Sequence, residues 1–256
     1  MSNPILPRAP LILVLAEVNF SPILSLSKKI ADIQEELRRV GFPEFWIANK
    51  EPDPELPQSE PEYLWKFGAK KNQTAIVISN DTLTLETSEY IEFNDFIKSF
   101  ERVLNVFAKI AHPDLLKSID LRYIDLIQDI DGKKSDDLIA PKFIQLEHIG
   151  VSQNHYQYES VQFETAEGIV RVNLIKSFDE AIVPPDIKPV VLIPVEKTDE
   201  DIILDIDHIV IFEETDFSIA KIIETFQRIH DQDVMPAFES IVTPLAIQLW
   251  GKEGRS

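Results

Sequence analysis

The sequence predicts an α+β protein in which an antiparallel sheet, in one piece or two, is covered by amphipathic helices. Three observations predict this class: apolar, β-prone segments recur along the chain, tight polar turns join several of them, and an amphipathic helix follows each group of strands. With 256 residues and 44% hydrophobic side chains, the chain is long enough for one large core or two smaller ones.

The first half of the chain, residues 1–130, is expected to form an α+β unit. Turns such as Asn80-Asp81 favour hairpins, and Asn94 or Asp95 is the expected N-cap of the second helix. The expected elements are strands at 9–20, 63–70, 73–79, 82–90 and 115–130, helices at 24–40 and 93–111, and an exposed proline-rich loop at 50–62.

The second half, residues 138–256, is expected to form a similar unit after a turn at 131–137. Asp216 or Ser218 is the expected N-cap of its closing helix. The expected elements are strands at 155–165, 169–177, 190–195 and 201–212, a loop at 179–189, a helix at 219–229 and a proline-divided helical tail. The order strand, acidic turn, helix occurs at both 82–107 and 208–233, which either duplication or chance explains. The halves form two domains or pack as one continuous domain.

Charge favours a basic partner. The chain has 44 acidic and 25 basic side chains, a net charge of −19, which disfavours nucleic acid and anionic membranes as ligands. Residues 1–128 hold 19 acidic and 14 basic side chains (net −5), whereas residues 129–256 hold 25 and 11 (net −14). The acidic run at 196–216 is either a solvated strand surface or a docking face for a basic protein. Its expected partner-binding residues are Asp199, Glu200, Asp201, Asp205, Asp207, Glu213 and Glu214.

Sequence motifs give no support for an enzyme. The absence of Cys excludes disulfides, thiolate metal sites and Cys nucleophiles, and the sequence has neither a G-x-S-x-G elbow nor a glycine-rich phosphate loop. No catalytic residue and no cofactor is expected. The N-terminus lacks a signal-peptide pattern and charges interrupt every apolar run, so a cytoplasmic protein without a membrane span is expected.

Two polar groups are candidate ligand sites. Asp205, Asp207 and His208, with His230 near the closing helix, have the side-chain types that bind divalent metals. Strand alternation places His208 on the opposite face from the two aspartates, so a solvated acidic edge is favoured over a metal site. Arg122 lies in the middle of an expected central strand.

Because a buried guanidinium needs a carboxylate, Asp120 or Glu17 is the expected partner of Arg122. An ion pair that fixes strand register is favoured, and an anion pocket around a free Arg122 is the alternative.

Aromatic residues and the C-terminal tail leave further alternatives open. The three tryptophans, Trp46, Trp65 and Trp250, are expected in the core, and a ligand cavity lined by them is the less favoured interpretation. The closing segment 236–251 is amphipathic and either docks internally or is offered to another chain, which leaves a homo-oligomer open.

Four stretches resemble one family in the same order along the chain. They are A-P-L-x-x-V-x-x-E-V-x-F at 9–20, Glu86-Thr87 to Tyr90 followed by Phe93, IDLRYIDLI at 119–127, and a tail with His230, Phe238-Glu239, Thr243 and Trp250-Gly251. The chain resembles a sporadically distributed family of bacterial and archaeal proteins of about this length and without established activity. This resemblance implies a cytoplasmic prokaryotic protein in a defence-like or toxin–antitoxin-like setting, and it implies no catalytic residues. Asp125 departs from the family pattern, which favours Asn.

We therefore expect a non-enzymatic interaction protein that binds a basic macromolecular partner. It would act as an antitoxin- or immunity-like neutraliser or as an accessory subunit in a defence-type system. The alternative is a small-molecule or metal-dependent enzyme or sensor with a site between the two halves, built from Arg122, Asp205, Asp207 and His230.

Overall fold

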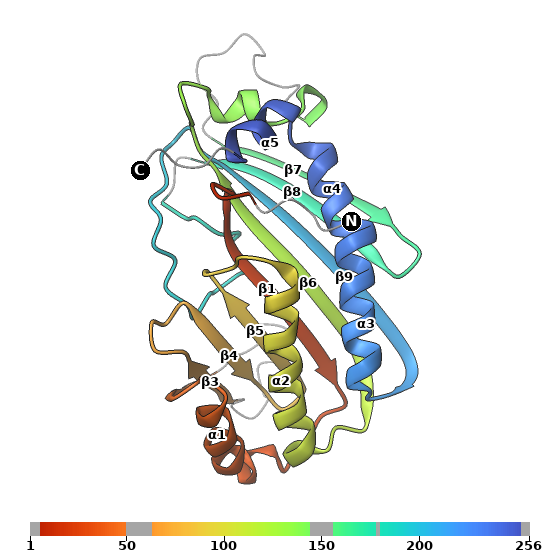
Figure 1. Cartoon of the computed structure of the whole chain (residues 1–256). Helices are drawn as coiled ribbons and strands as arrows, with labels where there is room; N and C mark the ends of the chain where they lie inside the picture. The colour runs from red at the N-terminus through yellow and green to blue at the C-terminus, as the bar shows by residue number, and fades with distance from the viewer. Residues whose placement is uncertain (1–5, 50–62, 144–155, 178–179, 252–256) are drawn as a thin grey trace.

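The computed structural model describes residues 6–49, 63–143, 156–177 and 180–251. In these residues, antiparallel strands form one sheet with helices packed on it, which confirms the predicted α+β class (Figure 1). No helix in the described residues is long and apolar enough to cross a bilayer.

The strands and helices have the following bounds. The strands are β1 (Leu11–Phe20), β2 (Glu44–Asn49), β3 (Tyr63–Gly68), β4 (Thr74–Ile78), β5 (Thr82–Thr87), β6 (Leu115–Ile127), β7 (Tyr156–Glu164), β8 (Ile169–Ser177) and β9 (Ile202–Asp216). The α-helices are α1 (Ile30–Arg39), α2 (Phe93–Ala111), α3 (Ile219–Ile229), α4 (Met235–Ile241) and α5 (Pro244–Trp250), and a π-helical turn, η4 (His230–Val234), joins α3 to α4. Short 3-10 turns, η1 (Leu26–Lys28), η2 (Ser135–Leu138) and η3 (Pro141–Phe143), complete the set.

The nine strands follow the order β2-β3-β4-β5-β1-β6-β9-β8-β7. Strands from both halves of the chain therefore share one sheet, and the halves meet where β6 pairs with β9. The sequence did not predict β2, and the expected loop at 50–62 lies outside the described residues.

Helices α1 to α5 cover one face of the sheet, which we call the helix side. The stripe predicted on α2 is buried there, with Phe100 fully buried against Phe226 of α3 at 5.7 Å between ring centroids. Phe20 of β1 packs on Phe107 of α2 at 5.0 Å. These aromatic contacts fix both long helices on the same face of the sheet.

The opposite face is covered in part by an irregular segment, residues 180–201, which we call the strap. A strand was expected at 190–195, but none forms, because prolines such as Pro189 and Pro194 lack the N–H that a ladder requires. The strap passes behind the sheet in Figure 1 and packs on Leu13, Ile124 and Ile203. We call this face the strap side.

Helix ends and the C-terminal tail show which local predictions hold. Ser218 caps α3 by accepting the N–H of Lys221, as predicted. α2 begins at Phe93, before the predicted caps, because Phe93 is itself buried in the core. In the tail, Trp250 is 2% exposed and its carbonyl accepts the N–H of Arg8, so this segment docks within the chain.

Gly168 should be sensitive to substitution because β9 passes directly beside it. A Cβ added at Gly168 would collide with the backbone carbonyl of Ile209. We expect Gly168→Ala to lower the free energy of unfolding by about 1–3 kcal/mol, measured by urea denaturation. Ala166→Ser, at an exposed position of the same turn, should leave it nearly unchanged. Equal stability of the two variants would contradict the close approach of β9.

Candidate functional site

The acidic run of the second half does not form one surface. Asp201, Asp205 and Asp207 are buried, with 2%, 0% and 8% exposure. The other members are exposed at positions 199–200, before β9, and 213–214, near its far end. At ~3.3 Å per residue these pairs lie ~40 Å apart. This corrects the expectation of a single docking face, because a strand near the middle of a covered sheet buries most of its side chains.

Arg122 pairs with two carboxylates, neither of which is a predicted partner. Its Nε and Nη2 donate to Asp205 at 2.7 and 2.9 Å, and its Nη1 and Nη2 donate to Asp186 of the strap at 2.7 and 3.2 Å. Burial opposes the charge of the guanidinium, but the hydrogen bonds to both carboxylates outweigh it and raise the pKa of Arg122. With four of five N–H donors occupied, Arg122 offers no free anion pocket.

A hydrogen-bonded chain completes the coordination of Asp205. Nδ2 of Asn173 donates to Asp205 at 2.7 Å, and the hydroxyl of Tyr158 donates to Oδ1 of Asn173 at 3.1 Å. These contacts join β6, β9, β8 and β7 across the strap side. Asp205 is therefore a fully buried, fully partnered carboxylate.

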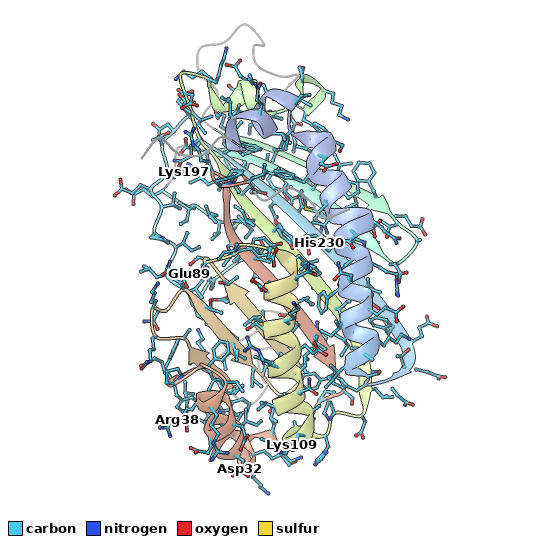
Figure 2. All side chains as sticks on the ribbon, viewed as in Figure 1. Asp32, Arg38, Glu89, Lys109, Lys197 and His230 are labelled. Atoms are coloured by element: carbon cyan, nitrogen blue, oxygen red, sulfur yellow. The ribbon has the colours of Figure 1, made fainter. Side chains whose placement is uncertain are left out.

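Glu86 of β5 holds the strap at a second point. Its Oε1 accepts the N–H groups of Val190 and Val191 at 2.6 and 2.8 Å. Burial raises the pKa of Glu86 to about 7, and the two backbone hydrogen bonds oppose this rise. Next to it, Ser88 donates to the carbonyl of Leu192 at 2.7 Å. In Figure 2, the label Glu89 marks the chain next to Ser88, and the label Lys197 marks the strap.

Asp207 lies directly opposite Arg122 in the β6–β9 ladder but is not its partner. Arg122 turns toward Asp205 and Asp186, which leaves Asp207 with Arg171 of β8 at 3.6 Å, beyond hydrogen-bond distance. Oδ1 of Asp207 is buried and receives no hydrogen bond from a nitrogen or hydroxyl donor of the described residues. Asp207 is therefore a largely buried carboxylate whose cation, the half-exposed guanidinium of Arg171, lies at ion-pair distance without a hydrogen bond to it.

Asp120 of β6 lies on the same face of the sheet as Asp207 of the neighbouring strand β9. Burial, then the charge of Asp207, raises the pKa of Asp120 well above its ordinary value; the charge of Glu17 adds to this rise, and the charge of Arg122 opposes it. Like charges close together in a buried place favour the neutral form of such a carboxyl.

Glu17 of β1 lies beside Asp120 in the β1–β6 ladder and accepts hydrogen bonds from Thr84 at 2.8 Å and Asn19 at 3.1 Å. We call Glu17, Asp120 and Asp207 the carboxylate cluster. The charged groups in and around it are the carboxyls of Glu17, Asp120, Asp186, Asp205 and Asp207 and the guanidiniums of Arg122 and Arg171. Five carboxyls against two guanidiniums leave three negative charges in excess if all are ionised, so the cluster lacks cations.

The carboxylate cluster borders a part of the strap side that the described residues leave uncovered. Ile211 of β9 and Ile169 of β8 are 70% and 41% exposed there. Ile209, the ladder partner of Asp120, is half-buried on the same face. Carboxylates beside exposed aliphatic side chains suit a long basic side chain, whose stem packs while its head group pairs.

The residues that were predicted as candidate metal ligands lie on opposite faces of the sheet. Asp205 and Asp207 face the strap, whereas His208 faces the helices, with Nε2 at 3.0 Å from Asp233 and 3.1 Å from Thr165. Burial lowers the pKa of His208, and Asp233 opposes this. Among the described residues, no group of three or more His, Asp or Glu side chains is placed to hold a metal ion.

His230 also lies on the helix side, close to the N-terminal end of α2 (Figure 2). Its ring stacks on Phe93 at 3.9 Å, and Nδ1 lies 2.8 Å from Asp231. Beside it, the hydroxyls of Tyr90 and Tyr123 are 3.3 Å apart. Although π-helical turns are frequent at functional sites, His230 is separated by the sheet from Asp205, Asp207 and Arg122.

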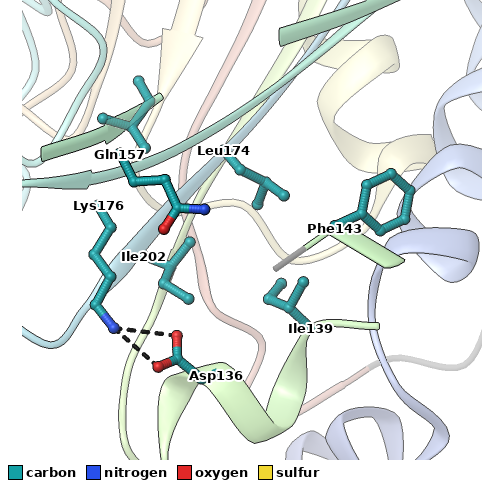
Figure 3. Close-up of a pocket in the computed structure, with 8 residues that line it drawn as sticks. Asp136, Ile139, Phe143, Gln157, Leu174, Lys176 and Ile202 are labelled. Atoms are coloured by element: carbon teal, nitrogen blue, oxygen red, sulfur yellow. Dashed lines mark hydrogen bonds and ion pairs between the residues drawn. The ribbon is translucent and has the colours of Figure 1, made fainter. Parts of the chain in front are cut away.

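The pockets do not enclose these residues. The pocket in Figure 3, beside the Lys176–Asp136 ion pair, holds about 20 Å³, which is enough for a water molecule. A cavity of about 340 Å³ lies among α4, α5 and the N-terminal segment, lined by apolar residues such as Phe238 and by Glu239. The three tryptophans lie in β2, β3 and α5 and line neither of these pockets.

The chain was compared with known proteins, and no protein-family model and no curated protein matches it. The resemblance to a sporadically distributed prokaryotic family therefore stays a prediction.

Two residues that hold the strap were not recognised from the sequence. Asp186 and Glu86 anchor the strap, but they lie far from each other and from Arg122 along the chain. The sequence contains one signal. Asp186 is the one acid in the proline-rich apolar segment 182–195, and a carboxylate that lies on a hydrophobic sheet face needs a cation beside it.

Arg122 should contribute strongly to stability. Arg122→Met leaves Asp205 buried without its cation, so we expect the free energy of unfolding to fall by about 3–5 kcal/mol, measured by urea denaturation. Arg171→Met removes a guanidinium whose side chain is 44% exposed, and should cost less than about 1 kcal/mol. Asp205→Asn in the Arg122→Met background should recover part of the loss. An unchanged melting temperature for Arg122→Met would instead favour the anion-pocket interpretation.

Asp125 should make stability depend on pH. Burial, then the charge of Asp205, raises the pKa of Asp125 to about 8. The folded state therefore holds a proton that the unfolded state releases near pH 4, so stability falls as pH rises from about 4 to about 8. In Asp125→Asn, the free energy of unfolding should decrease by up to about 1.4 kcal/mol less per pH unit over this range than in wild type, measured by urea denaturation. Exposed Glu213→Gln should keep the wild-type slope; an unaltered slope in Asp125→Asn would show that Asp125 does not titrate in this range.

Proposed function

We propose that this protein is a non-enzymatic interaction protein that binds a basic protein through the carboxylate cluster and the uncovered sheet face beside it. The net charge of −19 favours a cationic partner and disfavours nucleic acid. On the family resemblance, we further propose a cytoplasmic role in a prokaryotic defence-type system, as an antitoxin- or immunity-like neutraliser or an accessory subunit.

The observation that carries this proposal is the buried Oδ1 atom of Asp207, which receives no hydrogen bond from the described residues. Asp207 pairs with the half-exposed guanidinium of Arg171 at 3.6 Å, and the carboxyls of Asp120 and Glu17 add negative charge beside it. An unsatisfied buried acceptor costs free energy in the isolated protein. A basic side chain of a partner, entering from the uncovered face, would supply the hydrogen bonds and the charge.

The enzyme or sensor alternative has less support from the geometry. Its residues do not converge, because Asp205 and Arg122 bind each other on the strap side, whereas His230 lies on the helix side against Phe93. The remaining member of that set, Asp207, lies in the carboxylate cluster, where it is largely buried beside Arg171.

The test compares two variants that each lose two carboxyl groups. Asp120→Asn with Asp207→Asn removes two carboxyls from the cluster, whereas Glu213→Gln with Glu214→Gln removes two from exposed positions of β9. In pull-downs from the native host followed by mass spectrometry, wild type and the Gln variant should capture the same basic protein, and the Asn variant should lose it. With the purified pair, affinity should fall at least about tenfold in the Asn variant, and the association rate should fall as salt increases.

Two outcomes would overturn this function. One is capture of the same partner by an Asn variant that melts like wild type. The other is an association rate that does not respond to ionic strength.

A further inference from the structure

β7 is an edge strand without the usual protection against pairing. It is the last strand on its side of the sheet, and within the described residues β8 is its one neighbour in the ladder (Figure 1). Natural edge strands are commonly short, bulged, or interrupted by proline or lysine, which prevents another chain from adding to the sheet. β7 has nine residues, pairs with β8 without a register shift, and contains no Pro, Lys or Arg. Its outer edge is therefore open to a further strand.

The outward main-chain groups of β7 follow from the turn after it. The N–H of Thr165 donates to the carbonyl of Gly168, so it points inward, toward the β8 side. Because main-chain groups alternate in direction along a strand, those of Tyr158, Ser160 and Gln162 point outward. All three residues are exposed. They present a row of N–H and C=O groups to which an extended segment can bind by β-augmentation.

Apolar side chains are exposed on both faces of this edge. Tyr158 lies on the strap side and is 50% exposed, although its hydroxyl donates to Asn173. Val161 and Phe163 lie on the helix side and are 40% and 51% exposed. A strand beside β7 would cover side chains on both faces, which is how cross-strand pairs stabilise a sheet.

Charge at this edge favours a basic segment. Residues 156–168 include three acids, Glu159, Glu164 and Glu167, and no Lys or Arg. Arg228 of α3 pairs with Glu167, which leaves Glu159 and Glu164 along β7. A second copy of this chain would bring a net charge of −19 to the same edge, so charge repulsion disfavours it. Lys or Arg side chains of a basic protein would instead lie beside the two glutamates.

We propose that the outer edge of β7 binds an extended segment of the basic partner, antiparallel to β7, as a further strand of the sheet. The proposal rests on the proposed function for the identity of the partner and adds a second point at which that partner docks. The two points are close, because Gln162, Arg171 and Asp207 lie in one row across β7, β8 and β9. At the usual strand spacing, the edge is about 10 Å from the carboxylate cluster.

The alternation of side chains along β7 predicts the sequence pattern of the segment. Basic residues are expected five positions apart, with apolar residues between and after them. An antiparallel segment that reads Arg-Val-Thr-Val-Thr-Arg-Val has this pattern. Its arginines lie beside Glu164 and Glu159, and its valines lie beside the three exposed apolar side chains, Phe163, Val161 and Tyr158.

The experiment measures binding of this heptapeptide, labelled with fluorescein, to the full-length protein by fluorescence anisotropy. The peptide should bind saturably, and its analogue with Glu in place of both Arg should bind at least about tenfold more weakly. N-methylation of its three central residues removes N–H donors from both edges of the peptide and should also weaken binding at least about tenfold. Equal affinity for all three peptides would overturn the proposal.

Variants of β7 test the edge directly. The N–H of Ser160 points outward, so Ser160→Pro removes a donor of the edge and leaves the β7–β8 ladder intact. The variant should melt like wild type and bind the peptide at least about tenfold more weakly, whereas Ser160→Ala should bind it as wild type does. Glu159→Lys with Glu164→Lys should reverse the preference, so that the acidic analogue binds more tightly than the basic peptide. This second variant gives a result even if Ser160→Pro does not fold.

The outcomes separate this inference from the proposed function. If a folded Ser160→Pro variant binds the peptide and the basic partner as wild type does, the β7 site is wrong, and loss of the partner in Asp120→Asn with Asp207→Asn still supports the proposed function. If the paired Asn variant keeps the partner, the proposed function fails, and the heptapeptide decides the β7 site alone. A dimer in sedimentation that Ser160→Pro converts to a monomer would show that a second copy occupies the edge and would overturn the proposal.

Discussion

The burial of one guanidinium, that of Arg122, organises the strap side of this protein. A charge at that depth is stable only with carboxylates around it, and the chain supplies one from β9 and one from the strap. The Asp186 contact draws an irregular, proline-rich segment across a hydrophobic sheet face. Glu86 then fixes the main chain of the same segment at a second point. The pairing of Arg122 thus holds the strap at Asp186, alongside Glu86 and the apolar contacts of the strap with the sheet face.

The same pairing determines where negative charge is left over. Because Arg122 turns toward Asp205 and Asp186, the carboxylate directly opposite it, Asp207, pairs instead with the half-exposed guanidinium of Arg171 at 3.6 Å. The helix side contrasts with this, since aromatic and aliphatic residues fill it and its buried histidines pair locally with Asp233 and Asp231. Carboxyl groups in excess of guanidiniums thus gather on the strap side, at the boundary between the strap and the uncovered face.

Local patterns in the sequence predicted most elements but not their long-range partners. Apolar periodicity located β1, α2 and α3, and Ser218 was identified as a helix cap, because these features depend on neighbours within a few residues. The segment 190–195 was mistaken for a strand, since its apolar composition reflects contact with the sheet face and not membership of a ladder. Likewise the acidic run appeared as one surface, whereas Asp205 and Asp207 are buried within β9 and Asp201 is buried in the turn before it, where Thr198 and Gln128 donate to its carboxylate. Asp186 as the partner of Arg122 could not be found, because the fold alone brings them together.

The position of β1 has a consequence for how the chain is made. β1 precedes both of its neighbours in the sheet, β5 and β6, along the chain; β5 ends at Thr87 and β6 at Ile127. One edge of β1 therefore lacks its native partner until β5 has left the ribosome, and the other edge until β6 has left it. Such a non-local arrangement folds slowly and leaves aggregation-prone strand edges exposed during translation. Holding factors that shield nascent chains should accordingly matter more for the yield of this protein than for that of a helical bundle of the same length.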